Sequence, residues 1–500
     1  MLSRLVVLVA AISAGAIGIV RGTWAVGGSD SSCYALMADA FARGALQPST
    51  PLATAAPWPD APRTFAPGGF IPSPRRVDAA SPICSPGFAL LIAPLRAIGP
   101  DAIFFFTPVA GALVVWWTFV LGRQIAGDLV GAAAAVTIAT TPVFLFQLVQ
   151  PMNDVTVAAI WTAIVVIAAR LPDRPGVLGG LCGLAILVRP NLAPSVLPVA
   201  IWAIAMAQRR WYVAGSFLIA LSPGVIFTLA LNHALYGHAL STGYGAGGDL
   251  FSTAYALANV RNYGSALFAT TLGFPLLGLA AVKVLRSSRR AVAGLVVAIA
   301  TMLAITYLLY SPFAEWWYLR FFLPVLPMLT VLAFAVLELV SRRSSVVVGA
   351  AAGLVLFMVT SEATAQAMDL SRLEARFRLA GEVMHRRLPD NAVFITVWES
   401  GSARYHAQRD AVLWDSLDPQ WLDRAVAWLK ARGLHPFIAV EEWEEEAFRN
   451  RFAAHAAIGS LDWPPRFDVA RRVRIFDPDD RARYLAGEPS HTENVWPDRR

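Results

Sequence analysis

The sequence predicts a polytopic α-helical membrane protein of about eleven spans, followed by a small exported α/β domain. The mean hydropathy of its 500 residues is +0.54 and only 15% of them are charged, whereas soluble proteins carry about a quarter charged residues. The charges are also unevenly spread, with 32 in residues 1–361 and 43 in residues 362–500. This composition excludes a cytosolic enzyme, a secreted disulfide scaffold and a disordered chain.

Apolar segments long enough to cross a bilayer, which takes about 17–25 residues, predict the individual spans. They cover residues 5–20, 102–121, 129–149, 154–169, 211–232, 264–285, 291–310, 318–340 and 346–360. Residues 176–207 are also apolar but contain Arg189-Pro190, so we expect two short spans that meet at this break. An alternative for residues 5–20 is a cleaved signal peptide, which would leave the later spans in the same orientation.

Basic residues predict the orientation, because cytoplasmic loops of membrane proteins are enriched in lysine and arginine. Eleven crossings place every basic loop inside, with a cytoplasmic N-terminus, an extracytoplasmic C-terminal domain and a location in the cytoplasmic membrane. The net charge of +7 is therefore a topology signal and indicates no nucleic-acid partner. Residues 86–98 contain Arg96 and cannot cross without inverting the later loops, so we expect an interfacial helix there. The basic loops contain Arg4, Arg123, Arg170, Arg174, Arg209, Arg210, Lys283, Arg286, Arg289, Arg290, Arg342 and Arg343.

Two regions are thus expected outside the membrane. The first is the loop of residues 21–100, which we assign to the multi-pass domain of residues 1–361. The second is the domain of residues 362–500, in which strands at 392–398 and 436–440 alternate with helices at 420–432 and 441–452, a pattern typical of α/β structure. Cys33 and Cys84 both lie in the first loop, and the oxidising side permits a disulfide, but the sequence leaves their pairing open.

Acidic side chains near hydrocarbon are costly, so those at the membrane edge are candidates for function. Asp30 lies where a helix over residues 31–43 is predicted to begin, and Asp154 lies at the outer end of a span. Each could instead cap its helix, and the spacing leaves both interpretations open. Of the eleven acidic residues in residues 1–361, we place Asp128, Asp173 and Glu338 on the inner side, and Asp30, Asp39, Asp60, Asp78, Asp101, Asp154, Asp249 and Glu315 on the outer side.

Several motifs follow one another in a characteristic order. Asp30 and Tyr34 of the first loop are followed by SPICSPGFALLIAPLRAIG, by Asp154, and then by GLAILVRPNLAPSVLP, LYGHALSTGYG and WWYLRFFLPVLP. This order and sidedness resemble the GT-C glycosyltransferases, specifically the bacterial relatives of protein O-mannosyltransferases and the lipid A aminoarabinose transferase. The resemblance covers nearly the whole chain.

The resemblance implies roles for particular residues. Asp30 would be the catalytic base and Asp154 the second acidic residue of the site, while Arg189 and Arg320 would lie near the phosphate of a lipid-linked donor. Tyr34, Arg75, Arg76, Tyr244 and Glu315 complete the expected substrate-binding set. The alternative for Arg320 is snorkelling to the interface, and for Arg189 satisfaction of the carbonyls at the helix break. Arg75 and Arg76 could equally be a solvated loop pair.

The chain also departs from its relatives. Ser31 follows Asp30 where many relatives have a second acidic residue, and Cys84-Ser85-Pro86 replaces a His-Pro-Pro-like or Lys-Pro-Pro-like sequence. No metal-ligand spacing is present, so we predict no cofactor, and a divalent metal stays open without support from a motif.

These residue types suit transfer from a polyprenyl-phosphate sugar, because its phosphate is already a good leaving group. The reaction then needs a base for the acceptor hydroxyl and cations for the departing phosphate. We therefore predict an inverting glycosyltransferase that acts at the outer face of the membrane on a lipid, polysaccharide or protein acceptor of the cell envelope. The alternatives are a lipid-linked oligosaccharide polymerase or ligase, and a non-enzymatic transporter or flippase.

Overall fold

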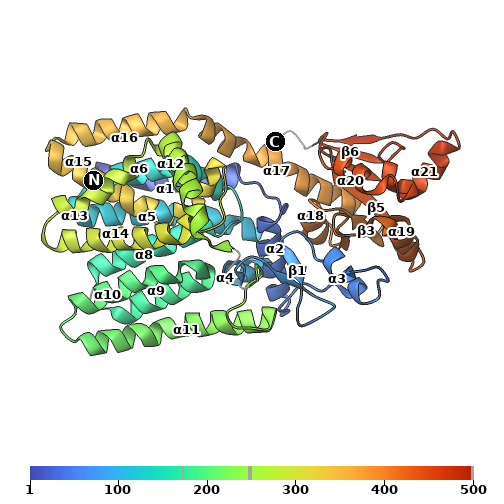
Figure 1. The fold of residues 1–500 in the computed structure, drawn as a ribbon. Helices are drawn as coiled ribbons and strands as arrows, with labels where there is room; N and C mark the ends of the chain where they lie inside the picture. The colour runs from blue at the N-terminus through green and yellow to red at the C-terminus, as the bar shows by residue number, and fades with distance from the viewer. Residues whose placement is uncertain (172–173, 246–249, 497–500) are drawn as a thin grey trace. The chain divides into compact units, whose positions relative to one another are not determined.

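The computed structural model describes residues 1–171, 174–245 and 250–496, and its chain divides into two compact units (Figure 1). The helical unit comprises Met1–Gly22, Asp101–Leu231 and Ala246–Leu370. The α/β unit comprises Thr23–Pro100, Asn232–Gly245 and Ser371–Arg500. The structure thus groups the first loop with the C-terminal residues, where the sequence interpretation grouped it with the membrane domain. Asp173 and Asp249, which the sequence places on the inner and the outer side of the membrane, lie outside the described residues.

Nearly every apolar segment singled out in the sequence is helical. Among the described residues, four helices are long and apolar enough to cross a membrane, or up to eight if each bent helix pair is one span. The number of eleven crossings stays a prediction. The elements of the helical unit, together with α11 and α17, which extend beyond it, are α1 (Leu2–Val20), η3 (Ala102–Phe105), α5 (Phe106–Ala126), α6 (Asp128–Thr140), α7 (Pro142–Leu148), α8 (Asp154–Arg170), α9 (Pro175–Val188), η4 (Pro190–Ser195), α10 (Val196–Met206), α11 (Arg210–Tyr236), η6 (Thr253–Tyr255), α12 (Ala256–Thr271), η7 (Phe274–Ala280), α13 (Ala281–Val284), α14 (Ser287–Leu308), η8 (Trp316–Phe322), α15 (Leu326–Ser341), α16 (Ser344–Val359) and α17 (Glu362–Arg386).

The span expected over residues 264–285 contains a sharp bend. Helix α12 ends at Thr271, and the chain bends by 106° before continuing as η7 and α13. Leu272 and Gly273 both have positive φ at this bend, and a Cβ on Gly273 would lie only 2.6 Å from the ring of Phe268. Likewise, η8 and α15, which cover most of the span expected over residues 318–340, meet at 83°.

Helix α8 is buried within the helical unit. Almost every residue from Asp154 to Ala168 is buried, and the helix packs against α5, α9 and α14. A helix that is apolar all round is expected in such an interior position. Its first residue, Asp154, is therefore placed inside the protein rather than at an exposed edge.

Among its described residues, the α/β unit contains a mixed six-stranded sheet of order β4-β3-β5-β7-β6-β8. Strand β3 pairs in parallel with both β4 and β5, whereas β7 is antiparallel to its neighbours β5 and β6. The predicted strand at 436–440 is confirmed within β5, whereas the strand predicted at 392–398 ends at Ile395. The predicted helix at 441–452 begins only at Glu445, because Glu441 still belongs to β5. The elements of this unit are α2 (Asp30–Ala42), η1 (Pro51–Thr54), α3 (Ala61–Thr64), β1 (Phe70–Pro72), β2 (Ala80–Pro82), α4 (Pro86–Ile92), η2 (Ala93–Ala97), β3 (Ala392–Ile395), α18 (Ser400–Tyr405), β4 (Ala411–Val412), η9 (Pro419–Trp421), α19 (Leu422–Lys430), β5 (His435–Glu441), α20 (Glu445–Phe452), η10 (Ala457–Ser460), β6 (Phe467–Val469), β7 (Val473–Phe476), α21 (Pro478–Leu485) and β8 (Glu493–Val495).

The first loop belongs to this unit because it supplies part of the core. Side chains on one face of the sheet, such as Val393 and Ile438, pack in one cluster with Trp58 and Phe65 from the loop. Alternate strand residues such as Phe394 form a second cluster on the other face, as the two-residue period of a strand requires.

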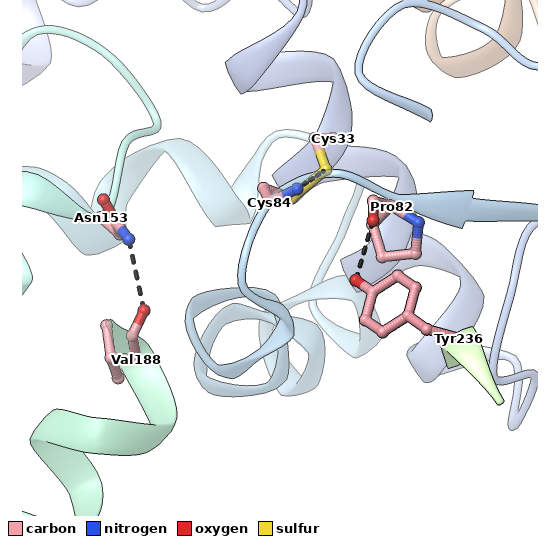
Figure 2. Close-up of a disulfide and its surroundings, with 6 residues drawn as sticks. All are labelled: Cys33, Pro82, Cys84, Asn153, Val188 and Tyr236. Carbon is pink, nitrogen blue, oxygen red and sulfur yellow. Dashed lines mark hydrogen bonds between the residues drawn. A yellow bond between two sulfur atoms is a disulfide. The ribbon is translucent and has the colours of Figure 1, made fainter. Parts of the chain in front are cut away.

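A disulfide between Cys33 and Cys84 ties α2 to the residues just before α4 (Figure 2), which settles a pairing that the sequence left open. The expected helix at 86–98 is present as α4 and η2, and its apolar residues pack against α2. Arg96 donates to the Asp39 carboxylate at 2.8 Å and to the Tyr405 hydroxyl at 3.0 Å. In the same unit, the Tyr236 hydroxyl donates to the Pro82 carbonyl at 2.8 Å (Figure 2).

Candidate functional site

Three of the predicted site residues meet inside the helical unit. The Arg189 guanidinium donates to Oδ1 of Asp154 at 2.6 Å, and Nη1 of Arg320 lies 3.9 Å from Oδ2 of the same carboxylate. The Asp154 side chain is 1% exposed, and both arginine side chains are largely buried. The fold thus brings two cations from different parts of the chain to one buried anion.

The helix break before Pro190 positions Arg189. Proline has no backbone N–H, so it cannot continue the hydrogen bonding of α9. Asn153 instead donates its side-chain amide to the Val188 carbonyl at 3.3 Å (Figure 2), which satisfies one acceptor at the end of the helix. Arg189 then adopts a non-helical backbone conformation with φ of −146°. The break at Pro190 therefore lets the Arg189 side chain leave the direction of the α9 side chains.

Aromatic rings line the arginine pair. The Tyr307 ring is fully buried and stacks on Phe321 with centroids 4.5 Å apart. The Arg189 guanidinium lies 5.3 Å from the Phe321 centroid, and that of Arg320 lies 5.2 Å from the Tyr318 centroid. These distances are typical of cation–π contacts, which hold a guanidinium in place without neutralising its charge.

The cluster formed by Asp154, Arg189 and Arg320 places two largely buried guanidiniums beside one buried carboxylate. Planar guanidinium groups suit phosphate oxygens because they can donate in pairs. The arrangement can therefore bind a phosphate and stabilise negative charge that develops on it.

The capping interpretation of Asp154 is not supported by this geometry. Asn153 occupies the N-cap position of α8, but its side chain makes no cap hydrogen bond within the described residues. Asp154 is already the first helical residue, and its carboxylate engages arginines instead of backbone N–H groups.

Asp30 lies in the α/β unit as the first residue of α2 and is partly buried. Ser29 is the N-cap, although no cap bond from its side chain is found in the described structure. The Ser31 hydroxyl bonds back to Gly27, donating to its carbonyl at 2.5 Å. A carboxylate is favoured at this position by the positive end of the helix dipole.

The remaining predicted residues are dispersed. The Tyr34 ring is buried and packs edge-on against Phe88 at 5.0 Å, so it contributes to the core. Arg75 is exposed and donates to the His233 carbonyl at 3.2 Å. Tyr244 and Glu315 are also exposed, and Glu315 lies just before η8.

Arg76 is engaged by a neighbour in its own loop. Its guanidinium makes two hydrogen bonds to Asp78, at 3.0 and 2.8 Å. This contact lowers the pKa of the Asp78 carboxyl, which keeps the pair ionised. The solvated loop-pair interpretation therefore fits Arg76 better than phosphate binding does.

Sequence reasoning missed three polar residues beside the arginines. The Asn191 amide donates to the Tyr307 hydroxyl at 3.1 Å and so fixes that ring. The buried Tyr263 hydroxyl has no hydrogen-bond partner among the described residues, although it lies within electrostatic range of Arg189 and Arg320. Asn191 follows directly after the Arg-Pro break, which was a usable signal, whereas Tyr263 follows Arg261 and Asn262 in no recognisable motif.

One group of possible metal ligands occurs in the described part of the chain, formed by His435, Asp477 and Asp479. Arg466 already contacts Asp477 at 2.8 Å, and Lys430 contacts Asp479. These cations neutralise the carboxylates, so the group is better explained as an ion-pair network.

No protein-family model matches the chain, and no curated protein matches it by sequence. Comparison with solved structures finds proteins that share the fold of this chain. ArnT from Cupriavidus metallidurans, solved with undecaprenyl phosphate, has a TM-score of 0.58 at 11% identity, covering 89% of this chain and 95% of ArnT. The oligosaccharyltransferase AglB from Archaeoglobus fulgidus, solved with an inhibitory peptide and a dolichol-phosphate, has a TM-score of 0.52 at 12% identity, covering 92% and 72%. At these identities the likeness establishes the fold.

Proposed function

We propose that the protein is an inverting glycosyltransferase that takes a sugar from a polyprenyl-phosphate donor at the outer face of the cytoplasmic membrane. The observation that carries the proposal is the sharing of one buried carboxylate by Arg189 and Arg320. The fold relatives add support, because ArnT was solved with undecaprenyl phosphate and AglB with a dolichol-phosphate. No observation favours the polymerase, ligase or transporter alternatives over this reaction.

In the proposed reaction an acceptor hydroxyl oxygen attacks the anomeric carbon of the donor sugar. The new glycosidic bond forms as the bond to the phosphate oxygen breaks, and the anomeric configuration inverts. The polyprenyl phosphate leaves with the bonding electron pair, and its negative charge is stabilised by Arg189 and Arg320. Asp30 accepts the proton of the attacking hydroxyl as general base.

Asp154 acts in this scheme as a positioning residue. Its two carboxylate oxygens contact the two arginines, so it holds the guanidiniums and offsets their mutual repulsion. Because both carboxylate oxygens of Asp154 already contact arginines, Asp30 is the better candidate for the base.

Substitution of Asp30 tests the proposal. We expect Asp30→Asn to reduce turnover by roughly 10²–10⁴-fold, because an amide cannot accept the hydroxyl proton. The measurement is release of undecaprenyl phosphate from labelled undecaprenyl-phosphate sugars by the purified protein, with cell-envelope extract as acceptor. Transfer of label into the extract identifies the acceptor fraction.

Asp60→Asn is the matched control, because Asp60 is an exposed carboxylate of the same first loop. Its left-handed backbone also tolerates asparagine. The control should retain full turnover. Full activity of Asp30→Asn would contradict the proposed base, since asparagine replaces aspartate well at a helix terminus.

A further inference from the structure

The sheet of the α/β unit has a topological switch point between β3 and β5. The chain leaves β3 to form β4 on one side and then crosses over to add β5 on the other side, with all three strands parallel. Ligands of open α/β sheets bind outside the carboxyl ends of the strands at such a point. The residues that follow Ile395 and Glu441 therefore lie where a ligand is expected to bind.

Two tryptophans occupy these positions. Trp398 follows β3 and Trp443 follows β5, and their side chains are 40% and 57% exposed. The rings meet edge-to-face with centroids 5.5 Å apart. The indole N–H of Trp443 donates to Oε2 of Glu441 at 3.0 Å, which fixes that ring. Large aromatic faces left exposed and held in place are typical of binding surfaces.

Carboxyl groups lie behind the tryptophan pair. Glu399, Glu441 and Glu444 are buried beside the two loops, and α17 adds Arg376, which contacts Glu441 at 2.9 Å. Both oxygens of Glu399 are fully buried and have no hydrogen-bond partner among the described residues. Burial raises the pKa of the Glu399 carboxyl well above its ordinary value, which favours its neutral form.

The site adjoins the segment that leads into Asp30. A Cβ on Gly28 would touch the Trp398 ring at 3.4 Å, and the Gly68 backbone N–H donates to the Ser400 hydroxyl at 2.9 Å. Gly401 packs so closely on Ser32 of α2 that an added Cβ would overlap the Ser32 hydroxyl. The loop after β3 and the start of α2 are therefore fixed against each other.

We propose that the switch-point site, formed by Trp398, Trp443 and the carboxyl groups of Glu399, Glu441 and Glu444, binds the carbohydrate part of the acceptor. The assignment to the acceptor rests on the proposed function, since it depends on Asp30 as the base. Sugar rings present C–H faces that stack on indole rings, and hydroxyls that can donate to the exposed carboxylate of Glu442 beside Trp443. An anionic lipid surface fits poorly, because the exposed neighbour of Trp443 is this acidic residue.

Saturation-transfer NMR on the full-length protein in nanodiscs tests the site directly. The probes are neutral oligosaccharides: maltohexaose, cellohexaose and chitohexaose. We expect saturation transfer from at least one of them, reduced at least fivefold in Trp398→Ala and in Trp443→Ala and retained in Trp443→Phe. Trp496→Ala is the matched control, because Trp496 is exposed in the same unit and should leave binding unchanged.

Absence of binding by all three probes, or binding that survives both alanine substitutions, would overturn the proposal. So would quenching of the fluorescence of these two tryptophans by nitroxide-labelled lipids, which would make them membrane anchors. In the transfer assay the same variants should raise the acceptor KM and leave the donor KM unchanged. If Asp30→Asn is fully active while Trp398→Ala loses saccharide binding, the proposed base fails but the carbohydrate site stands.

Discussion

At the residue scale, the helical unit stabilises two buried arginines with one carboxylate. Removing one partner of a buried ion pair typically costs about 3–5 kcal/mol, because an uncompensated charge stays in the interior. Arg189 has a direct 2.6 Å bond to Asp154, whereas Arg320 lies at 3.9 Å.

Replacement of Arg320 by lysine separates phosphate binding from snorkelling. If Arg320 holds the donor phosphate, Arg320→Lys should raise the donor KM or lower turnover by about tenfold or more, because an ammonium cannot make paired hydrogen bonds. The acceptor KM should change little. The measurement is donor-dependent kinetics of the wild type, Arg320→Lys and Arg320→Ala. Wild-type kinetics for the lysine variant would identify a snorkelling side chain, since both residues have long apolar stems.

Glu444 makes the stability of the α/β unit depend on pH. Burial raises the pKa of its carboxyl to about 7 from an ordinary value of 4.5. The folded state therefore binds more protons than the unfolded state between these values, and the free energy of unfolding falls as the pH rises through this window. The loss amounts to about 3 kcal/mol by pH 8.

Thermal unfolding of the purified protein between pH 5 and pH 8 measures this effect. The unfolding temperature should fall with rising pH in the wild type and fall less in Glu444→Gln, which stays neutral. Glu442→Gln is the matched control, because Glu442 is exposed and adjacent in sequence. An identical pH dependence in Glu444→Gln and the wild type would show that another group titrates.

At the element scale, the position of α2 depends on contacts with distant parts of the chain. The disulfide fixes its first turn to the start of α4, and α18 packs against it from the C-terminal region. The helix that carries Asp30 is thus held at both sides by elements far away in sequence. Such support reduces the freedom of a catalytic group and improves its orientation.

Gly401→Ala tests the contact between α18 and α2. The new methyl group would overlap the Ser32 hydroxyl and lie 2.7 Å from its Cβ, so α2 must shift. We expect a loss of about 1–3 kcal/mol in stability together with reduced turnover. Ser32→Gly should restore both in the double variant, because it removes the overlapping atoms. Gly99→Ala is the control, since a Cβ there meets nothing within 4 Å.

At the scale of the whole molecule, the apolar helices and the fold relatives indicate a membrane protein. The basic loops predict which side each region occupies. A periplasm-active reporter fused after Arg500 should be active, and one inserted between Lys283 and Arg290 should be inactive. A cytosol-active reporter should give the reverse pattern. A cytoplasmic C-terminus would contradict the orientation and place Asp30 on the wrong side for an exported acceptor.

The sequence by itself determined the apolar helical region, the strand at 436–440, the start of the strand at Ala392, and the resemblance to the GT-C glycosyltransferases. These features depend on hydropathy, on local periodicity and on the order of motifs, all of which are properties of the linear chain. The sequence also supplied Asp154, Arg189 and Arg320 as candidates. It could not show that they meet, because the residues come from α8, the break after α9, and η8.

Only the tertiary structure decided which parts of the chain share a core. Trp58 and Phe65 pass for ordinary loop residues until they are seen packed against Val393 and Ile438. Likewise, the acidic run that starts at the end of β5 does not reveal by its sequence that Glu441 and Glu444 are buried while Glu442 is exposed. Burial and ion pairing depend on which elements pack together, and that choice is made by long-range contacts that local sequence patterns do not encode.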